Sequence, residues 1–164
     1  MDKTRFASLL SLLALALLIV SSCNRNTLLD DTRTFDNDVW NRFTPEAFDI
    51  QVNNIEDYYN IDVSATVDTA LYRYKTLPLL FNIDSPNGEH RTFYAELPFT
   101  ENGRPRGTVD DHYRTADRRI RAWFSFNSTG HHHIEVKQTT SQYDLEGIHS
   151  ITLAVTKAKL DYKM

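Results

Sequence analysis

The chain has 164 residues, a single cysteine and a formal net charge of −4 at pH 7. A mildly acidic chain lacks the basic footprint of a nucleic-acid-binding protein, and one cysteine excludes an internal disulfide. Hydrophobic residues make up 41% of the sequence and aromatic residues 12%, which argues against general disorder. This length and composition favour one folded domain that is stabilised by packing.

The N-terminus has the layout of a bacterial lipoprotein signal. Lys3 and Arg5 precede an apolar run from Phe6 to Val20, and two serines lead directly to Cys23. The run is shorter than the roughly 20 residues that a membrane-spanning helix needs. We predict a signal peptide over residues 1–22 and attachment of diacylglycerol to Cys23, which would anchor the protein in a membrane outside the cytoplasm. Plain secretion after cleavage and a retained helix are the alternatives.

The rest of the chain divides into a polar start and a body with period-two alternation. Residues 23–34 predict a lipidated N-terminus with a linker, and residues 35–164 predict the folded domain. Apolar and polar residues alternate in seven segments of this domain, a pattern typical of strands with one buried face. The segments are 48–52, 61–67, 77–83, 93–99, 120–126, 134–136 and 151–155. The pattern predicts an all-β fold, a single antiparallel β-sandwich of jelly-roll or immunoglobulin-like type.

Two long connections, 68–76 and 100–118, interrupt the alternation. Long connections in a compact domain often carry function. If the first is extended, Tyr72 and Tyr74 lie on one side of it and form an exposed pair. The second contains a charge-dense run. The candidate interaction surface therefore consists of Tyr72, Tyr74, Asp111, His112 and Tyr113. A solvated, ion-paired loop is the alternative for the charged run.

A run of three histidines, His131 to His133, follows a Gly turn. His131 and His133 would share one face of a strand, which is half of a zinc site, but nothing in the sequence fixes a third ligand. Three half-exposed histidines at the start of a strand are the favoured interpretation. The chain has no Gly-x-Ser-x-Gly elbow, Walker loop or His-Glu-x-x-His motif. We therefore predict no enzymatic activity, no metal and no cofactor.

Motifs spread along the chain resemble one known family, the GldH family of gliding-motility lipoproteins of the Bacteroidota. The resemblance covers the chain from Cys23 to about Lys159, and the run at 131–133 departs from the family pattern. The matching pieces are the lipobox at Cys23, Tyr59-Asn60-Ile61-Asp62-Val63, Tyr72-x-Tyr74-x-x-Leu77-x-Leu79, Ile83-Asp84-Ser85-Pro86-Asn87-Gly88, Phe124-x-Phe126 before Gly130-x-x-x-Ile134-Glu135-Val136, and Leu145-x-Gly147-Ile148-x-Ser150-Ile151.

The resemblance implies a cell-envelope lipoprotein that serves gliding or the associated type IX secretion system, and it implies no catalytic residue. We expect a non-enzymatic component or accessory of that apparatus, with other envelope proteins as partners and no nucleic acid. Asn24 stands where enterobacterial lipoproteins of the inner membrane carry aspartate, which favours the outer membrane, facing the periplasm. The alternative is a carbohydrate-binding lipoprotein of a glycan-uptake system, which two or three coplanar exposed aromatic rings would favour. A metal-dependent hydrolase is a third interpretation.

Overall fold

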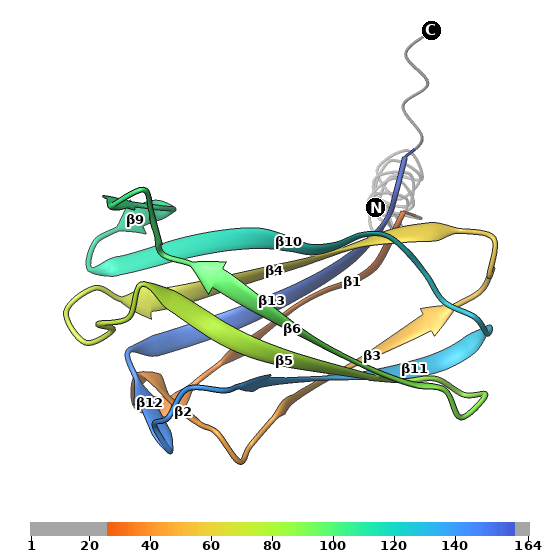
Figure 1. The fold of residues 1–164 in the computed structure, drawn as a ribbon, viewed down its shortest axis with the longest axis horizontal. Helices are drawn as coiled ribbons and strands as arrows, with labels where there is room; N and C mark the ends of the chain where they lie inside the picture. The colour runs from red at the N-terminus through yellow and green to blue at the C-terminus, as the bar shows by residue number, and fades with distance from the viewer. Residues whose placement is uncertain (1–25, 160–164) are drawn as a thin grey trace, which may run out of the picture.

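The computed structural model describes residues 26–159, which form two antiparallel β-sheets packed face to face (Figure 1). The predicted β-sandwich is therefore confirmed. The predicted signal peptide and Cys23, the predicted site of acylation, lie outside the described residues. Within the described part of the chain, no helix is long and apolar enough to cross a membrane.

The first sheet has five strands, and all its neighbours pair antiparallel. In spatial order they are β1 (Thr27–Thr34), β13 (Ile148–Lys157), β4 (Tyr58–Asp68), β10 (Tyr113–Ser125) and β9 (Thr108–Asp110).

The second sheet has four strands, and two short ribbons complete the fold. In spatial order the sheet contains β3 (Glu46–Val52), β11 (Gly130–Gln138), β5 (Thr76–Asp84) and β6 (His90–Pro98). The ribbons pair β2 (Val39–Asn41) with β12 (Asp144–Glu146), and β7 (Thr100–Glu101) with β8 (Arg104–Pro105); a 3-10 turn, η1 (Asp36–Asp38), precedes β2.

The core lies between the two sheets and consists of the apolar residues that alternate along the strands. Phe81 and Phe93 stack with their ring centroids 5.1 Å apart, on the neighbouring strands β5 and β6. All seven predicted strands are present. The expected alternation fails in β10, where Ala122 is exposed because the register with β4 shifts on both sides of Arg121. Each shift inserts extra residues and turns the following side chains to another face.

The predicted linker over residues 23–34 is wrong for its second part, because residues 27–34 form β1. Thr27 lies opposite Thr156 and Thr34 opposite Ser150 on β13. Leu28 and Leu29 pack against the core. β1 is an edge strand, and most of its side chains are polar. Polar side chains protect the edge of a sheet from pairing with other chains. They also remove the alternation of apolar and polar residues by which a strand is recognised in a sequence. The folded domain therefore begins within a few residues of Cys23.

The long connection predicted over residues 100–118 is also wrong, because it contains β7, β8, β9 and the start of β10. Tyr113 pairs with Asp110 on β9 and with Asp68 on β4. The side chains of β9 are exposed, so this edge strand carries no buried face that the sequence could reveal.

The two ends of the sandwich differ in their relation to the N-terminus. β4 runs the length of the first sheet, and its 11 residues span about 33 Å at roughly 3.3 Å per residue. Tyr58 opens β4 beside the start of β1, and we call this the tether end. Asp68 closes β4 beside loop 69–75, turn 111–112 and η1, and we call this the distal end. Figure 1 shows the two ends on opposite sides of the molecule.

Candidate functional site

The five residues of the predicted interaction surface all lie at the distal end. Asp111 and His112 form the turn between β9 and β10, and Tyr113 opens β10. Tyr72 and Tyr74 lie in loop 69–75, between β4 and β5. Asp111 has a φ of 56°, a left-handed conformation that aspartate tolerates better than most residues. The structure therefore brings the two predicted stretches together.

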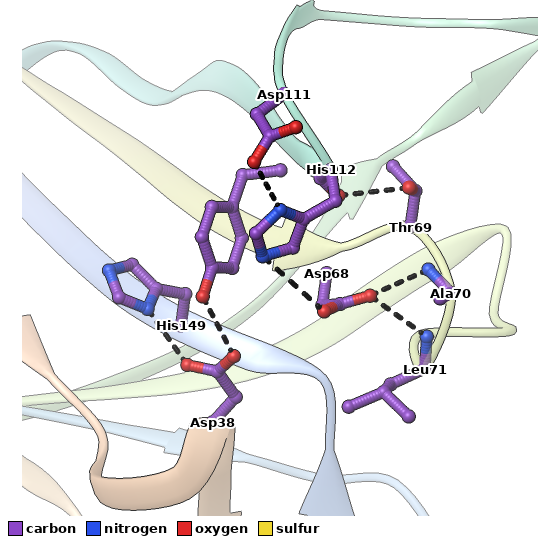
Figure 2. Close-up of polar contacts among 9 residues, drawn as sticks. Asp38, Asp68, Thr69, Ala70, Leu71, Asp111, His112 and His149 are labelled. Atoms are coloured by element: carbon purple, nitrogen blue, oxygen red, sulfur yellow. Dashed lines mark hydrogen bonds and ion pairs between the residues drawn. The ribbon is translucent and has the colours of Figure 1, made fainter.

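The His112 turn is fixed to the start of loop 69–75 (Figure 2). The backbone carbonyl of His112 accepts hydrogen bonds from the backbone N–H and the hydroxyl of Thr69, both at 2.9 Å. The imidazole Nδ1 lies 2.7 Å from the Asp111 carboxylate, and Nε2 lies 3.9 Å from the Asp68 carboxylate. These contacts hold the turn and the loop as one unit.

Asp68 and Gly147 fix the conformation of loop 69–75. The Asp68 carboxylate accepts the backbone N–H groups of Ala70 and Leu71 at 2.7 and 3.2 Å, a local turn that aspartate often makes. The Asp68 N–H donates to the carbonyl of Gly147 at 2.9 Å. Gly147 has a φ of +83°, and a Cβ there would lie 2.5 Å from the backbone nitrogen of Tyr72. Only glycine permits this close approach of two backbones.

The rings of His112, Tyr113 and His149 form a stack, and two of them contact the carboxylate of Asp38. His149 Nδ1 lies 2.8 Å from Asp38 Oδ1, and the Tyr113 hydroxyl donates to Asp38 Oδ2 at 3.1 Å. The Tyr113 ring lies between His112 and His149, with centroids 4.1 and 4.5 Å away. Desolvation, followed by the hydrogen bond to Asp38, raises the pKa of Tyr113, so the phenol remains a donor at neutral pH. The stack joins η1 and β13 to β10.

These polar groups satisfy one another and act as a clamp. Within residues 26–159, no group of three or more His, Cys, Asp or Glu side chains is arranged to hold a metal ion. In the histidine run, His132 is buried, where its ring nitrogens lie 3.1 Å from the Ser85 hydroxyl and 3.0 Å from the Ser128 carbonyl. His133 contacts Asp49 at 2.9 Å. The histidines are not all half-exposed, because the middle one points into the core.

The predicted exposed pair of tyrosines is wrong for Tyr72. Its side chain is only 7% exposed, and its hydroxyl donates to the carbonyl of Thr76 at 2.9 Å. Burial raises the pKa of Tyr72. The turn at Asp68 prevents an extended loop, so the Tyr72 ring packs on Phe99, with centroids 5.2 Å apart. Tyr74 remains 41% exposed at the tip of the loop.

Two exposed aromatic residues beside this loop were not predicted. Phe43 and Tyr143 are both exposed, and their rings stack with centroids 5.5 Å apart. The guanidinium of Arg42 lies 5.8 and 5.9 Å from the two centroids. In the sequence, Phe43 precedes Thr44-Pro45 and Tyr143 stands alone among polar residues. A large aromatic residue in a polar turn was the signal that could have identified them.

A groove of about 330 Å³ lies between Tyr74 and the segment on either side of Tyr143. It is lined by Leu71, Arg73, Tyr74, Gln142, Asp144, Leu145 and Glu146. Leu71 is also exposed. We use the name distal surface for the exposed side chains of Leu71, Arg73 and Tyr74 on this groove together with the aromatic pair Phe43 and Tyr143 and the half-buried Arg42 beside it.

A second groove, of about 320 Å³, lies on the other side of Tyr74 and is basic. Arg73, Lys75 and Arg114 line it. In the described part of the chain, none of these three side chains pairs with a carboxylate, whereas other arginines do. Unpaired cations around an exposed tyrosine suit a partner with acidic groups.

The described residues thus form a β-sandwich with a polar clamp and exposed aromatic residues at one end. Residues 27–155 match the family model of the GldH lipoprotein, and the chain belongs to this family. Comparison with curated proteins gave no match. The family is one of membrane-anchored lipoproteins of the cell envelope in a gliding-motility context, and it is not known as a family of enzymes.

Proposed function

We propose that the protein is a non-enzymatic component of the gliding or type IX secretion apparatus, anchored by acylated Cys23 in the outer membrane and facing the periplasm. Its distal surface contacts another protein of the envelope. Acylation confines both partners to two dimensions, which raises their effective concentration and allows weak contacts to suffice. Family membership supports the envelope setting.

The observation that carries the proposed contact is the composition of the distal surface. Phe43 and Tyr143 stack beside Arg42, and Tyr74 and Arg73 line the neighbouring groove. Aromatic residues and arginine dominate the binding energy of protein interfaces. The surface lies about 33 Å along β4 from the tether end, so a membrane at that end leaves it accessible.

The carbohydrate-binding alternative gains no support from the aromatic residues of the distal end. Tyr72 is buried, and its ring is tilted by 58° from that of Tyr74. Phe43 and Tyr143 cover each other's faces at an angle of 26°. A sugar ring stacks on an open aromatic face, and neither pair offers a coplanar platform.

Photo-crosslinking in native envelopes tests the contact. A photoreactive amino acid replaces Tyr74 or Tyr143 in the full chain with Cys23 intact. We expect both positions to crosslink to an envelope protein of the motility or secretion machinery, because both belong to the distal surface. The matched control is Tyr94, an exposed tyrosine on the edge strand β6 outside that surface, where we expect no such product.

Crosslinks from position 94 equal to those from positions 74 and 143 would contradict a specific distal contact. Exclusive recovery of glycan-uptake proteins from positions 74 and 143 would support the carbohydrate alternative against the motility role.

A further inference from the structure

We infer that the tether end is a membrane-contact surface, on which Tyr58 and Trp123 rest at the level of the lipid headgroups. The inference rests on the proposed acylation of Cys23 and goes beyond it. It gives the acyl anchor a fixed partner surface on the folded domain and therefore sets the orientation of the sandwich on the bilayer.

Only a short stretch of chain separates Cys23 from the first sheet. Asn24 and Arg25 are the only residues between Cys23 and Asn26. Three consecutive Cα–Cα steps span at most about 11 Å, whatever their conformation. The Asn26 carbonyl accepts the backbone N–H of Lys157 at 2.6 Å, so Asn26 is already part of the first sheet. A lipid on Cys23 thus holds the tether end within about 11 Å of its own attachment point.

Two exposed aromatic rings lie close to Asn26 at the tether end. The N–H of Ala158, the residue after Lys157, donates to the Tyr58 carbonyl at 2.8 Å. Tyr58 therefore lies two strand spacings from Asn26, about 10 Å. Trp123 follows on the next strand, and its ring centroid is 6.3 Å from that of Tyr58. Tyr58 is 50% exposed and Trp123 is 46% exposed. Both rings lie within the zone that the short tether brings to the bilayer.

The backbone at Trp123 has an unusual conformation. Its φ is 55°, in the left-handed region that bulky residues rarely occupy. The register between β10 and β4 shifts between Arg121 and Phe124, which marks an irregularity around Trp123. Such local strain persists where the surrounding structure enforces it, and it gathers at functional positions. Here it leaves a large indole in contact with solvent, while Phe126 fills the core.

The chemistry of this end fits a lipid surface. Tyrosine and tryptophan favour the membrane–water interface because each combines an apolar ring with a polar group. Ile55, in the loop before β4, adds an exposed apolar side chain. Of the nearby cations, Lys157 pairs with Asp57 and Arg119 with Asp62, whereas Lys159 is exposed and has no carboxylate partner among the described residues. The rings therefore provide the part of the contact that does not depend on anionic lipids.

Tryptophan fluorescence on vesicles tests this orientation. The acylated mature protein is incorporated into phosphatidylcholine vesicles that contain lipids brominated near the headgroup or deep in the acyl chain, and flotation selects the membrane-held protein. The chain has two tryptophans, and Trp40 is buried at the distal end, where it donates to the Thr44 carbonyl at 3.0 Å. The matched variant Trp123→Phe keeps Trp40 and is expected to keep the parental melting temperature.

We expect blue-shifted emission and quenching in the parent, stronger with the shallow label than with the deep one, and no quenching in Trp123→Phe. If the parent protein floats with the vesicles but neither brominated lipid changes its tryptophan emission, the inference is overturned and the acylation stands. Equal quenching of parent and variant would also overturn it. A mature chain that does not float would contradict the acylation, and the inference with it.

Discussion

Replacing Gly147 by alanine is expected to lower the free energy of unfolding by about 3 kcal/mol. Gly147 has a φ of +83°, and a left-handed conformation costs an L-residue roughly 1–2 kcal/mol. The new Cβ would also meet the backbone nitrogen of Tyr72 at 2.5 Å and the Leu71 carbonyl carbon at 3.0 Å. Neither backbone atom can rotate away, so overpacking adds roughly 1–3 kcal/mol. Urea unfolding of the mature chain measures the effect.

Gly103→Ala is the matched control for this substitution. Gly103 has a φ of +75°, but no atom lies within 4 Å of a Cβ built there. This variant isolates the conformational part of the loss, about 1 kcal/mol. Equal losses for the two variants would contradict the close packing of loop 69–75 on Gly147. Gly147→Ala should also weaken crosslinking from position 74, because that loop carries Tyr74.

Deleting residues 27–34 is expected to destabilise the domain by at least about 3 kcal/mol, or to prevent folding. The deletion removes β1, with Leu28 and Leu29 that pack on the core. Burial of one leucine contributes roughly 1.5–3 kcal/mol when complete. The deletion also exposes the edge of β13, and an exposed, apolar edge strand promotes association between molecules. Urea unfolding and size-exclusion chromatography measure the two effects.

An insertion provides the control for this deletion. Eight glycine and serine residues placed between Asn24 and Arg25 leave β1 intact, so the free energy of unfolding should remain at the parental value. If residues 27–34 were only a linker, their deletion would be equally harmless, and that result would contradict the structure of the first sheet.

The sequence predicted the strands that have one buried face and missed those that do not. Alternation along 61–67 and 77–83 located β4 and β5, because each side chain on these strands faces either the core or the outside. β1 and β9 were not predicted because the side chains of these edge strands are mostly polar or fully exposed. The alternation of β10 fails at Ala122 because bulges move side chains between faces, and an alternation pattern does not reveal a bulge.

At the distal end, the sequence predicted the residues that stand together in one stretch and missed those that are distant in the chain. Asp111, His112 and Tyr113 were predicted because charged and aromatic residues gathered in one stretch. Asp38 was missed, because it lies 75 residues before its partner Tyr113 and only the register of the strands brings them together. The prediction of an exposed Tyr72 is wrong because the burial of this residue depends on the turn at Asp68, which a period-two pattern does not reveal.

We propose a rigid sandwich that begins within about 11 Å of a lipid anchor and presents its distal surface away from the bilayer. This picture depends on acylation of Cys23. Metabolic labelling with an alkyne-tagged fatty acid, followed by purification of the mature chain, tests it most directly. We expect label on the parent and none on Cys23→Ala, which should leave the membrane fraction. A parent chain that carries no label and still sediments with the envelope would contradict the account.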